Sequence, residues 1–177
     1  MNIEFVKNPR VKKKFGFRKP DKEDGAQVWE LIKGTSSLEA DSPYSYLMWC
    51  ELFSETSVIA YEEGNQEKPV GFISGFIHPE KPDTLFIWQT AIDEAQRGRE
   101  LVKRMLYNLL NRDCCEKIQY AETAESSSNI LSGNLAIELA RKFNLDYKIS
   151  RYFESEHFPK RKKEENEVEW LYRVGPF

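Results

Sequence analysis

The sequence predicts an α/β fold in which a mixed central sheet carries helices on both faces. Strand-like segments cluster around one continuous apolar segment, residues 84–92, and helical segments are inserted near the start, after the fourth strand and after the fifth. The 177 residues are 40% hydrophobic and 13% aromatic, which is enough for one well-buried core and too little for two. We therefore expect a flexible N-terminal arm over residues 1–14 and a single domain over residues 15–177.

The first elements are an edge strand and a helix. Residues 15–19 alternate as an edge strand does, and Pro20 closes the segment. Residues 21–33 form a helix that ends at Gly34 and turns one apolar face inward. That face consists of Val28, Trp29, Leu31 and Ile32.

A second helix starts at Ser42 and Pro43, a favourable N-cap and first helical residue. Its apolar residues recur at helical spacing, which supports the prediction of a helix. They are Tyr44, Leu47, Met48, Leu52 and Phe53.

The rest of the chain supplies most of the sheet and two more helices. Strands are predicted at residues 57–61, 69–78, 84–92, 118–122, 147–153 and 168–174, and helices at 100–111 and 129–142. Gly71 and Gly75 permit a close backbone approach or a bulge in the second of these strands. Each helix has an apolar face that we expect to point into the core. This face consists of Leu101, Met105, Leu106, Leu109 and Leu110 in the helix at 100–111, and of Leu131, Leu135, Leu139 and Phe143 in the helix at 129–142.

Charge and composition exclude several classes of partner. The formal charge of −3 arises from 26 basic and 29 acidic residues that are interleaved, which argues against nucleic acid. Apolar runs such as residues 70–77 are strand-sized, well short of the roughly 18 residues of a membrane helix. The basic N-terminus lacks the apolar stretch of a secretory signal, so we expect a cytoplasmic protein.

Histidine and cysteine usage exclude several kinds of chemistry. The two histidines, His78 and His157, stand in no motif with Ser or Cys, which argues against a catalytic triad. Ligand spacing typical of metal sites is absent, and neither a Walker A nor a G-x-G-x-x-G motif occurs. We expect no metal. The three cysteines, Cys50, Cys114 and Cys115, are expected to be reduced and structural.

Residues 93–101 follow the strand at 84–92 as a short glycine-containing loop that leads into a helix. Such a loop directs backbone N–H groups and the positive end of the helix dipole at one point, which suits a diphosphate.

This strand, loop and helix resemble the acetyl-CoA site of the GNAT N-acetyltransferases. The strand PDTLFIWQTAI (82–92) is similar to that of the L-2,4-diaminobutyrate acetyltransferases, and further matches occur in order at residues 17–33, 36–62, 70–77 and 169–174. The resemblance implies the GNAT fold, a homodimer, and acetyl transfer from acetyl-CoA to the terminal (N4) amine of L-2,4-diaminobutyrate in ectoine synthesis. The implied partners are thus a small diamine and acetyl-CoA.

The resemblance also implies roles for individual residues. Contacts to the diamine and catalysis fall to Glu39, Tyr44, Trp88 and Glu169. Acetyl-CoA binding falls to Thr90, Ile92, Arg97, Gly98, Arg99, Leu101 and Asn129. Taken without the resemblance, the same residues are a loop carboxylate, core aromatics, a strand-edge charge and solvated helix-end charges.

Three positions depart from the family pattern. Ala95 lacks the usual Gln or Arg side chain, Glu100 replaces Gly or Ala and would bring a carboxylate close to the diphosphate, and Asn166 stands where a histidine is expected. Two alternatives therefore stay open: a GNAT-fold protein that acts on another small amine, and a non-catalytic binding domain with a degraded CoA loop.

Overall fold

The computed structural model describes residues 14–35, 40–97, 99–126, 130–158 and 168–177. These residues form a seven-stranded sheet of order β1-β2-β3-β4-β5-β7-β6, in which β4 and β5 are parallel and the other neighbours antiparallel. The strands are β1 (Phe15–Arg18), β2 (Val58–Glu62), β3 (Pro69–Ile77), β4 (Thr84–Ile92), β5 (Tyr120–Ser126), β6 (Tyr147–Phe153) and β7 (Glu169–Val174). The helices are α1 (Gly25–Lys33), α2 (Pro43–Leu52), α3 (Arg99–Leu110) and α4 (Ile130–Phe143).

The predicted α/β class is confirmed, and two strands have the predicted bounds, β4 and β6. The strand predicted at 118–122 instead runs over Tyr120–Ser126, because Ile118 belongs to the preceding turn and is buried in the core. The helix predicted at 21–33 begins with a 3-10 turn, Lys22–Asp24, before α1. The predicted arm lies outside the described residues except for Lys14.

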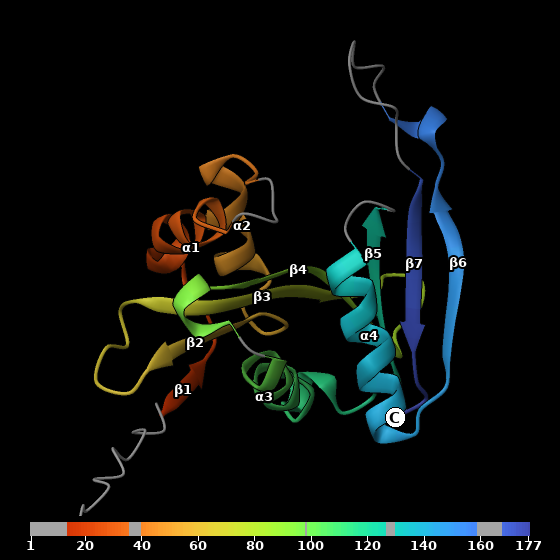
Figure 1. Cartoon of the computed structure of the whole chain (residues 1–177). Coiled ribbons are helices and arrows are strands. Elements are labelled where there is room, and N and C mark those ends of the chain that lie inside the picture. Colours follow the sequence, from red (N-terminus) through yellow and green to blue (C-terminus); the bar gives the residue numbers. More distant parts are fainter. Residues whose placement is uncertain (1–13, 36–39, 98, 127–129, 159–167) are drawn as a thin grey trace, which may run out of the picture.

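Helices cover opposite faces of the sheet, α1 and α2 on one and α3 and α4 on the other (Figure 1). Alternate residues of β2 show the two cores directly, since Val58 and Ala60 pack with α3 while Ile59 packs with α1. We call these the α1/α2 face and the α3/α4 face. None of the described helices is both long and apolar enough to cross a membrane.

The helix predicted to start at Ser42 and Pro43 is confirmed as α2, but it buries other residues than the apolar set that indicated it. Tyr46 and Cys50, one turn apart, are fully buried, whereas the residues of that set are all exposed: Tyr44, Leu47, Met48, Leu52 and Phe53. The helix is apolar on every side, so spacing alone does not select the buried side. Phe143, predicted to point inward from α4, is 59% exposed because it lies at the last residue of that helix.

Candidate active site

The parallel strands β4 and β5 separate part-way along their length. Their pairing runs from Thr84 and Tyr120 to Ile87 and Thr123, after which β4 continues beside β3 and β5 continues beside β7. Main-chain groups that a continuous ladder would use thus face a gap between the two strands. The predicted central strand therefore has one paired half and one half that is open toward β5.

A β-bulge marks the point of separation. In the β3–β4 register Gly75 opposes Ile87 and Ser74 opposes Gln89, which leaves Trp88 as the extra residue of β4. The two backbones approach closely here, because a Cβ atom on Gly75 would lie 2.8 Å from the carbonyl oxygen of Phe86. The predicted role of Gly75 in a close approach is thereby confirmed.

A cavity of about 620 Å³ opens on the α3/α4 face at this gap. Its lining includes four residues predicted from the sequence, namely Trp88, Thr90, Ile92 and Arg97. The walls also include Leu106 of α3, Leu139 of α4 and Tyr172 of β7. Leu101 is 5% exposed and its side chain packs in the core, so its backbone is the part available to a ligand.

The loop before α3 differs from the predicted cluster of free N–H donors. The N–H of Ala95 donates to Asp93 Oδ1 at 2.9 Å, that of Gln96 donates to the Asp93 carbonyl, and that of Arg97 donates to the Glu94 carbonyl. These donors are satisfied within the loop. Free backbone donors for an anion are therefore expected in the first turn of α3, which begins at Arg99.

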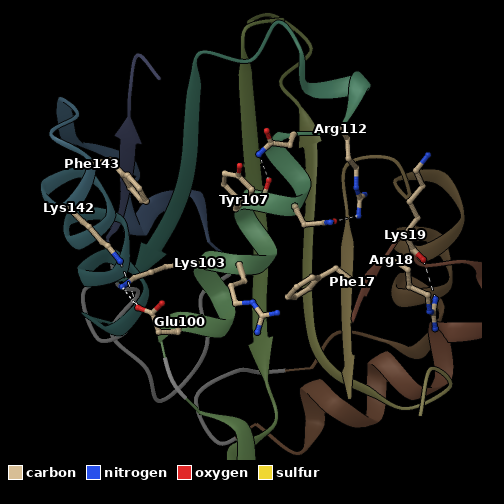
Figure 2. Close-up of a pocket in the computed structure, with 12 residues that line it drawn as sticks. Phe17, Arg18, Lys19, Glu100, Lys103, Tyr107, Arg112, Lys142 and Phe143 are labelled. Carbon is tan, nitrogen blue, oxygen red and sulfur yellow. Dashed lines mark hydrogen bonds and ion pairs between the residues drawn. The ribbon is translucent and has the colours of Figure 1, made fainter. Parts of the chain in front are cut away.

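A basic groove of about 670 Å³ runs along the outer side of α3 (Figure 2). It is lined by one acidic residue, Glu100, and by six basic ones: Arg18, Lys19, Lys103, Arg104, Arg112 and Lys142. The groove and the cavity share Lys103, Tyr107, Asn111 and Phe143, so the two adjoin.

Glu100 points toward two lysines in this groove. Its carboxylate lies 3.1 Å from Lys103 Nζ and 3.8 Å from Lys142 Nζ, so it joins α3 to α4 (Figure 2). The hydrogen bond and the charge of Lys103, followed by the charge of Lys142, lower the pKa of Glu100. The carboxylate predicted to oppose a bound diphosphate is thus partly neutralised by its neighbours.

Trp88 connects the cavity to the α1/α2 face. Its ring stacks on that of Trp49 from α2, with centroids 5.9 Å apart, and the side chain is 49% exposed. Tyr44, in the first turn of α2, is 67% exposed. No hydrogen bond or ring contact within the described ranges joins Tyr44 to Trp88 or Glu169.

Glu169 opens β7 on the α1/α2 face. It pairs with Ser126, three residues beyond Thr123, whereas Tyr172 on the same strand faces the cavity. Partial burial raises the pKa of Glu169, and its carboxylate has no hydrogen bond or ion pair with any described residue. A half-buried carboxylate without a partner is suited to receive an ammonium group or a proton.

Tyr46 is the residue of this region that sequence reasoning missed. Its side chain is fully buried, its hydroxyl accepts from the Asp41 N–H at 3.0 Å, and it donates to Gln89 Oε1 at 3.2 Å. Burial raises the pKa of Tyr46, so the hydroxyl keeps its proton at neutral pH. The nearest signal in the sequence was its place one turn before Cys50 on α2.

Three predicted site residues, Glu39, Gly98 and Asn129, lie outside the described part of the chain, as does Asn166. The three cysteines are free thiols, and burial raises the pKa of both Cys50 and Cys115 to about 12. No group of His, Cys, Asp or Glu residues in the described ranges is arranged to hold a metal ion.

A mixed sheet that opens between two parallel strands, with a cavity behind the gap, is the architecture of an acyl-CoA-dependent transferase. The sequence model of the acetyltransferase (GNAT) family matches residues 26–131. The fold is also found in proteins of low sequence similarity. One is an N-acetyltransferase from Staphylococcus aureus, at 17% identity and a TM-score of 0.63 over 93% of this chain and 99% of that one.

The particular subfamily follows from closer relatives. The L-2,4-diaminobutyric acid acetyltransferase of Oceanobacillus iheyensis is 48% identical over 160 residues, 90% of this chain and 87% of the relative. That of Virgibacillus pantothenticus is 48% identical over 157 residues, 89% and 95% of the two chains. The diaminobutyrate acetyltransferase EctA from Paenibacillus lautus, solved with L-2,4-diaminobutyric acid and coenzyme A, is 36% identical with a TM-score of 0.82 over 93% and 96% of the chains. The chain therefore belongs to the GNAT family and, within it, to the L-2,4-diaminobutyric acid acetyltransferases.

Proposed function

We propose that this protein transfers the acetyl group of acetyl-CoA to the terminal (N4) amine of L-2,4-diaminobutyrate. The observation that carries the proposal is the full-length similarity to an enzyme solved with that amine and coenzyme A, together with a cavity behind the β4–β5 gap. The alternative of another small amine is weaker, since the relatives at 48% identity share one named substrate.

The reaction needs few protein groups because a thioester is already activated. The neutral amine nitrogen attacks the thioester carbonyl, the C–N bond forms, the C–S bond breaks, and the proton lost by nitrogen balances the departing thiolate. An amine with a lysine-like pKa costs about 4–5 kcal/mol to deprotonate at pH 7. A binding site that is drier than bulk water and a nearby carboxylate offset that cost.

The described residues supply these requirements from opposite faces of the sheet. On the α3/α4 face, Thr90, Ile92 and Arg97 hold the pantetheine and phosphate portions of acetyl-CoA, and the basic groove provides positive charge. The bulge at Trp88 supports a backbone oxyanion donor near Trp88 to Thr90, since a bulge leaves ladder groups unpaired. On the α1/α2 face, Glu169 receives an ammonium group or its proton.

The remaining roles follow from the resemblance alone. Glu39 and Tyr44 would contact the diamine, while Gly98, Arg99, Leu101 and Asn129 would contact acetyl-CoA. The role in ectoine synthesis and the cytoplasmic location remain predictions.

We also propose a homodimer. It is supported by apolar side chains exposed on the α1/α2 face, which extend from α2 to β6. They include Tyr44, Leu47, Leu52, Trp88 and Phe153, all at least 39% exposed. Exposed apolar patches of this kind mark interaction surfaces.

The product identifies the reaction. The purified protein is incubated with acetyl-CoA and L-2,4-diaminobutyrate, and the acetylated nitrogen is assigned by NMR. The proposal predicts acetylation at N4, whereas acetylation at N2, or no product, would contradict it.

A further inference from the structure

Tyr46 lies at the centre of a hydrogen-bonded chain between α1, α2 and β4. The Asp41 backbone is held at both ends, because its N–H donates to the Tyr46 hydroxyl at 3.0 Å and its carbonyl accepts from Trp29 Nε1 at 3.2 Å. The same hydroxyl donates to Gln89 Oε1 at 3.2 Å. The backbone just before α2 is thus fixed to the side chain of Gln89.

The β4 end of this chain lies beside the site. Gln89 directly follows the bulged residue Trp88, and both lie in the half of β4 that does not pair with β5. On its β5 side the bulge has no strand pairing to hold it, because the pairing of β4 with β5 ends at Ile87 and Thr123. A hydrogen bond from the rigid, fully buried Tyr46 side chain therefore limits the positions that Gln89 adopts.

A purely structural role is a poor explanation for this hydroxyl. Burying a phenol oxygen is costly unless it is hydrogen-bonded, and phenylalanine would fill the same volume without that cost. The hydroxyl also makes both of its bonds outside its own helix, to the backbone just before α2 and to Gln89, the residue after the cavity-lining Trp88.

We propose that Tyr46 is a positioning residue for the amine substrate, acting through Asp41 and Gln89. The inference rests on the proposed function. In this role Tyr46 holds the backbone before α2 at a fixed distance from the bulge of β4, and so sets the width of the amine-binding side of the site. The pantetheine and phosphate contacts of acetyl-CoA lie on the opposite face, so we expect its KM not to depend on this distance.

The test is Tyr46→Phe, compared with Ser74→Ala. Ser74 is a matched control because it is fully buried, lies across from Gln89 in the β3–β4 register, and its hydroxyl has no partner in the described ranges. Steady-state kinetics with diaminobutyrate and acetyl-CoA are measured with thermal unfolding. For Tyr46→Phe we expect kcat/KM for diaminobutyrate to fall about tenfold or more while KM for acetyl-CoA stays within about twofold. Ser74→Ala should retain the wild-type kinetic constants.

A second substitution keeps the test decisive if Tyr46→Phe does not fold. Gln89→Met removes the other end of the bond at a partly buried position and should produce the same selective loss. The double variant should be no worse than the more affected single variant, because both remove one unit. Wild-type kinetics in both single variants, or equal losses toward both substrates, would overturn the inference. No turnover by the wild type would instead overturn the proposed function and this role with it.

Discussion

Glu122 on β5 accepts a hydrogen bond of 2.5 Å from Arg173 Nη1 on the adjacent strand β7. The Glu122 side chain is 2% exposed and also lies 3.1 Å from Lys81 Nζ. Arg173 in turn lies over the ring of Tyr120 at 3.8 Å and donates to Thr84 Oγ1. The buried carboxylate of Glu122, near the start of the paired half of β4 and β5, thus has Arg173 as its shorter and less exposed ion pair and Lys81 as its longer, more exposed one.

Arg173→Met should destabilise the fold strongly, because it leaves the Glu122 carboxylate buried with only an exposed lysine. We expect a loss of about 3–5 kcal/mol in the free energy of unfolding, measured by urea denaturation. Lys81→Met is the control, and its loss should stay below about 1 kcal/mol because Lys81 is 42% exposed. Equal losses in the two variants would show that the ion pair between Glu122 and Arg173 stabilises the fold no more than the one between Glu122 and Lys81 does.

Glu169→Gln should reduce activity without reducing stability. The specificity constant for diaminobutyrate should fall about tenfold to hundredfold, because the neutral amide forms no ion pair with an ammonium group and does not accept its proton, while acetyl-CoA affinity stays unchanged. Kinetics with each substrate varied in turn provide the measurement. Glu116→Gln, an exposed site, serves as the control.

The pH dependence of stability should reveal the same carboxylate. Its pKa is raised in the folded protein, so the folded state binds this proton more tightly than the unfolded state does. The contribution of Glu169 to stability is therefore highest at acid pH and declines as the pH rises from the ordinary glutamate value through the raised folded value. At pH 7 the Glu169→Gln variant should be at least as stable as the wild type by thermal unfolding, and a clear loss would mean that Glu169 has a partner in the fold.

The charge at Glu100 should weaken acetyl-CoA binding. Replacing it with glutamine releases Lys103 and Lys142 for the phosphates, and calorimetric titration should show affinity rising about two- to fivefold at low salt. The gain should shrink at high ionic strength because Glu100 and Lys142 are exposed and their charges are screened by salt. Glu80→Gln is the control on a distant exposed site. Unchanged or weaker binding in Glu100→Gln would place Glu100 away from the phosphates.

The sequence was most informative where local pattern and burial coincide. The bounds of β4 were correct because its first four residues are buried on both faces of the sheet, which produces a continuous apolar run. The cavity-lining positions Thr90 and Ile92 followed from their place on this strand and from the family resemblance.

The sequence was least informative where several local arrangements are equally compatible with it and tertiary packing determines which one forms. Helix α2 is apolar all round, so the burial of Tyr46 rather than Tyr44 depends on how the helix lies over β3 and β4. The internal bonding of Ala95 and Gln96 was hidden because it depends on the turn that Asp93 starts. Likewise, the sequence of β5 does not show that Glu122 pairs with Arg173, which is 51 residues away.

The most direct test of the account compares specificity constants for a panel of amines. The reaction is monitored by the release of free CoA. An ammonium group of a short diamine matches the carboxylate of Glu169, which has no partner among the described residues, whereas longer amines and monoamines leave charged groups unpaired. We predict that kcat/KM for diaminobutyrate exceeds that for lysine, spermidine and simple monoamines by about tenfold to hundredfold. Equal values across the panel would contradict the assignment of diaminobutyrate as substrate, and the absence of CoA release with every amine would indicate a non-catalytic binding domain.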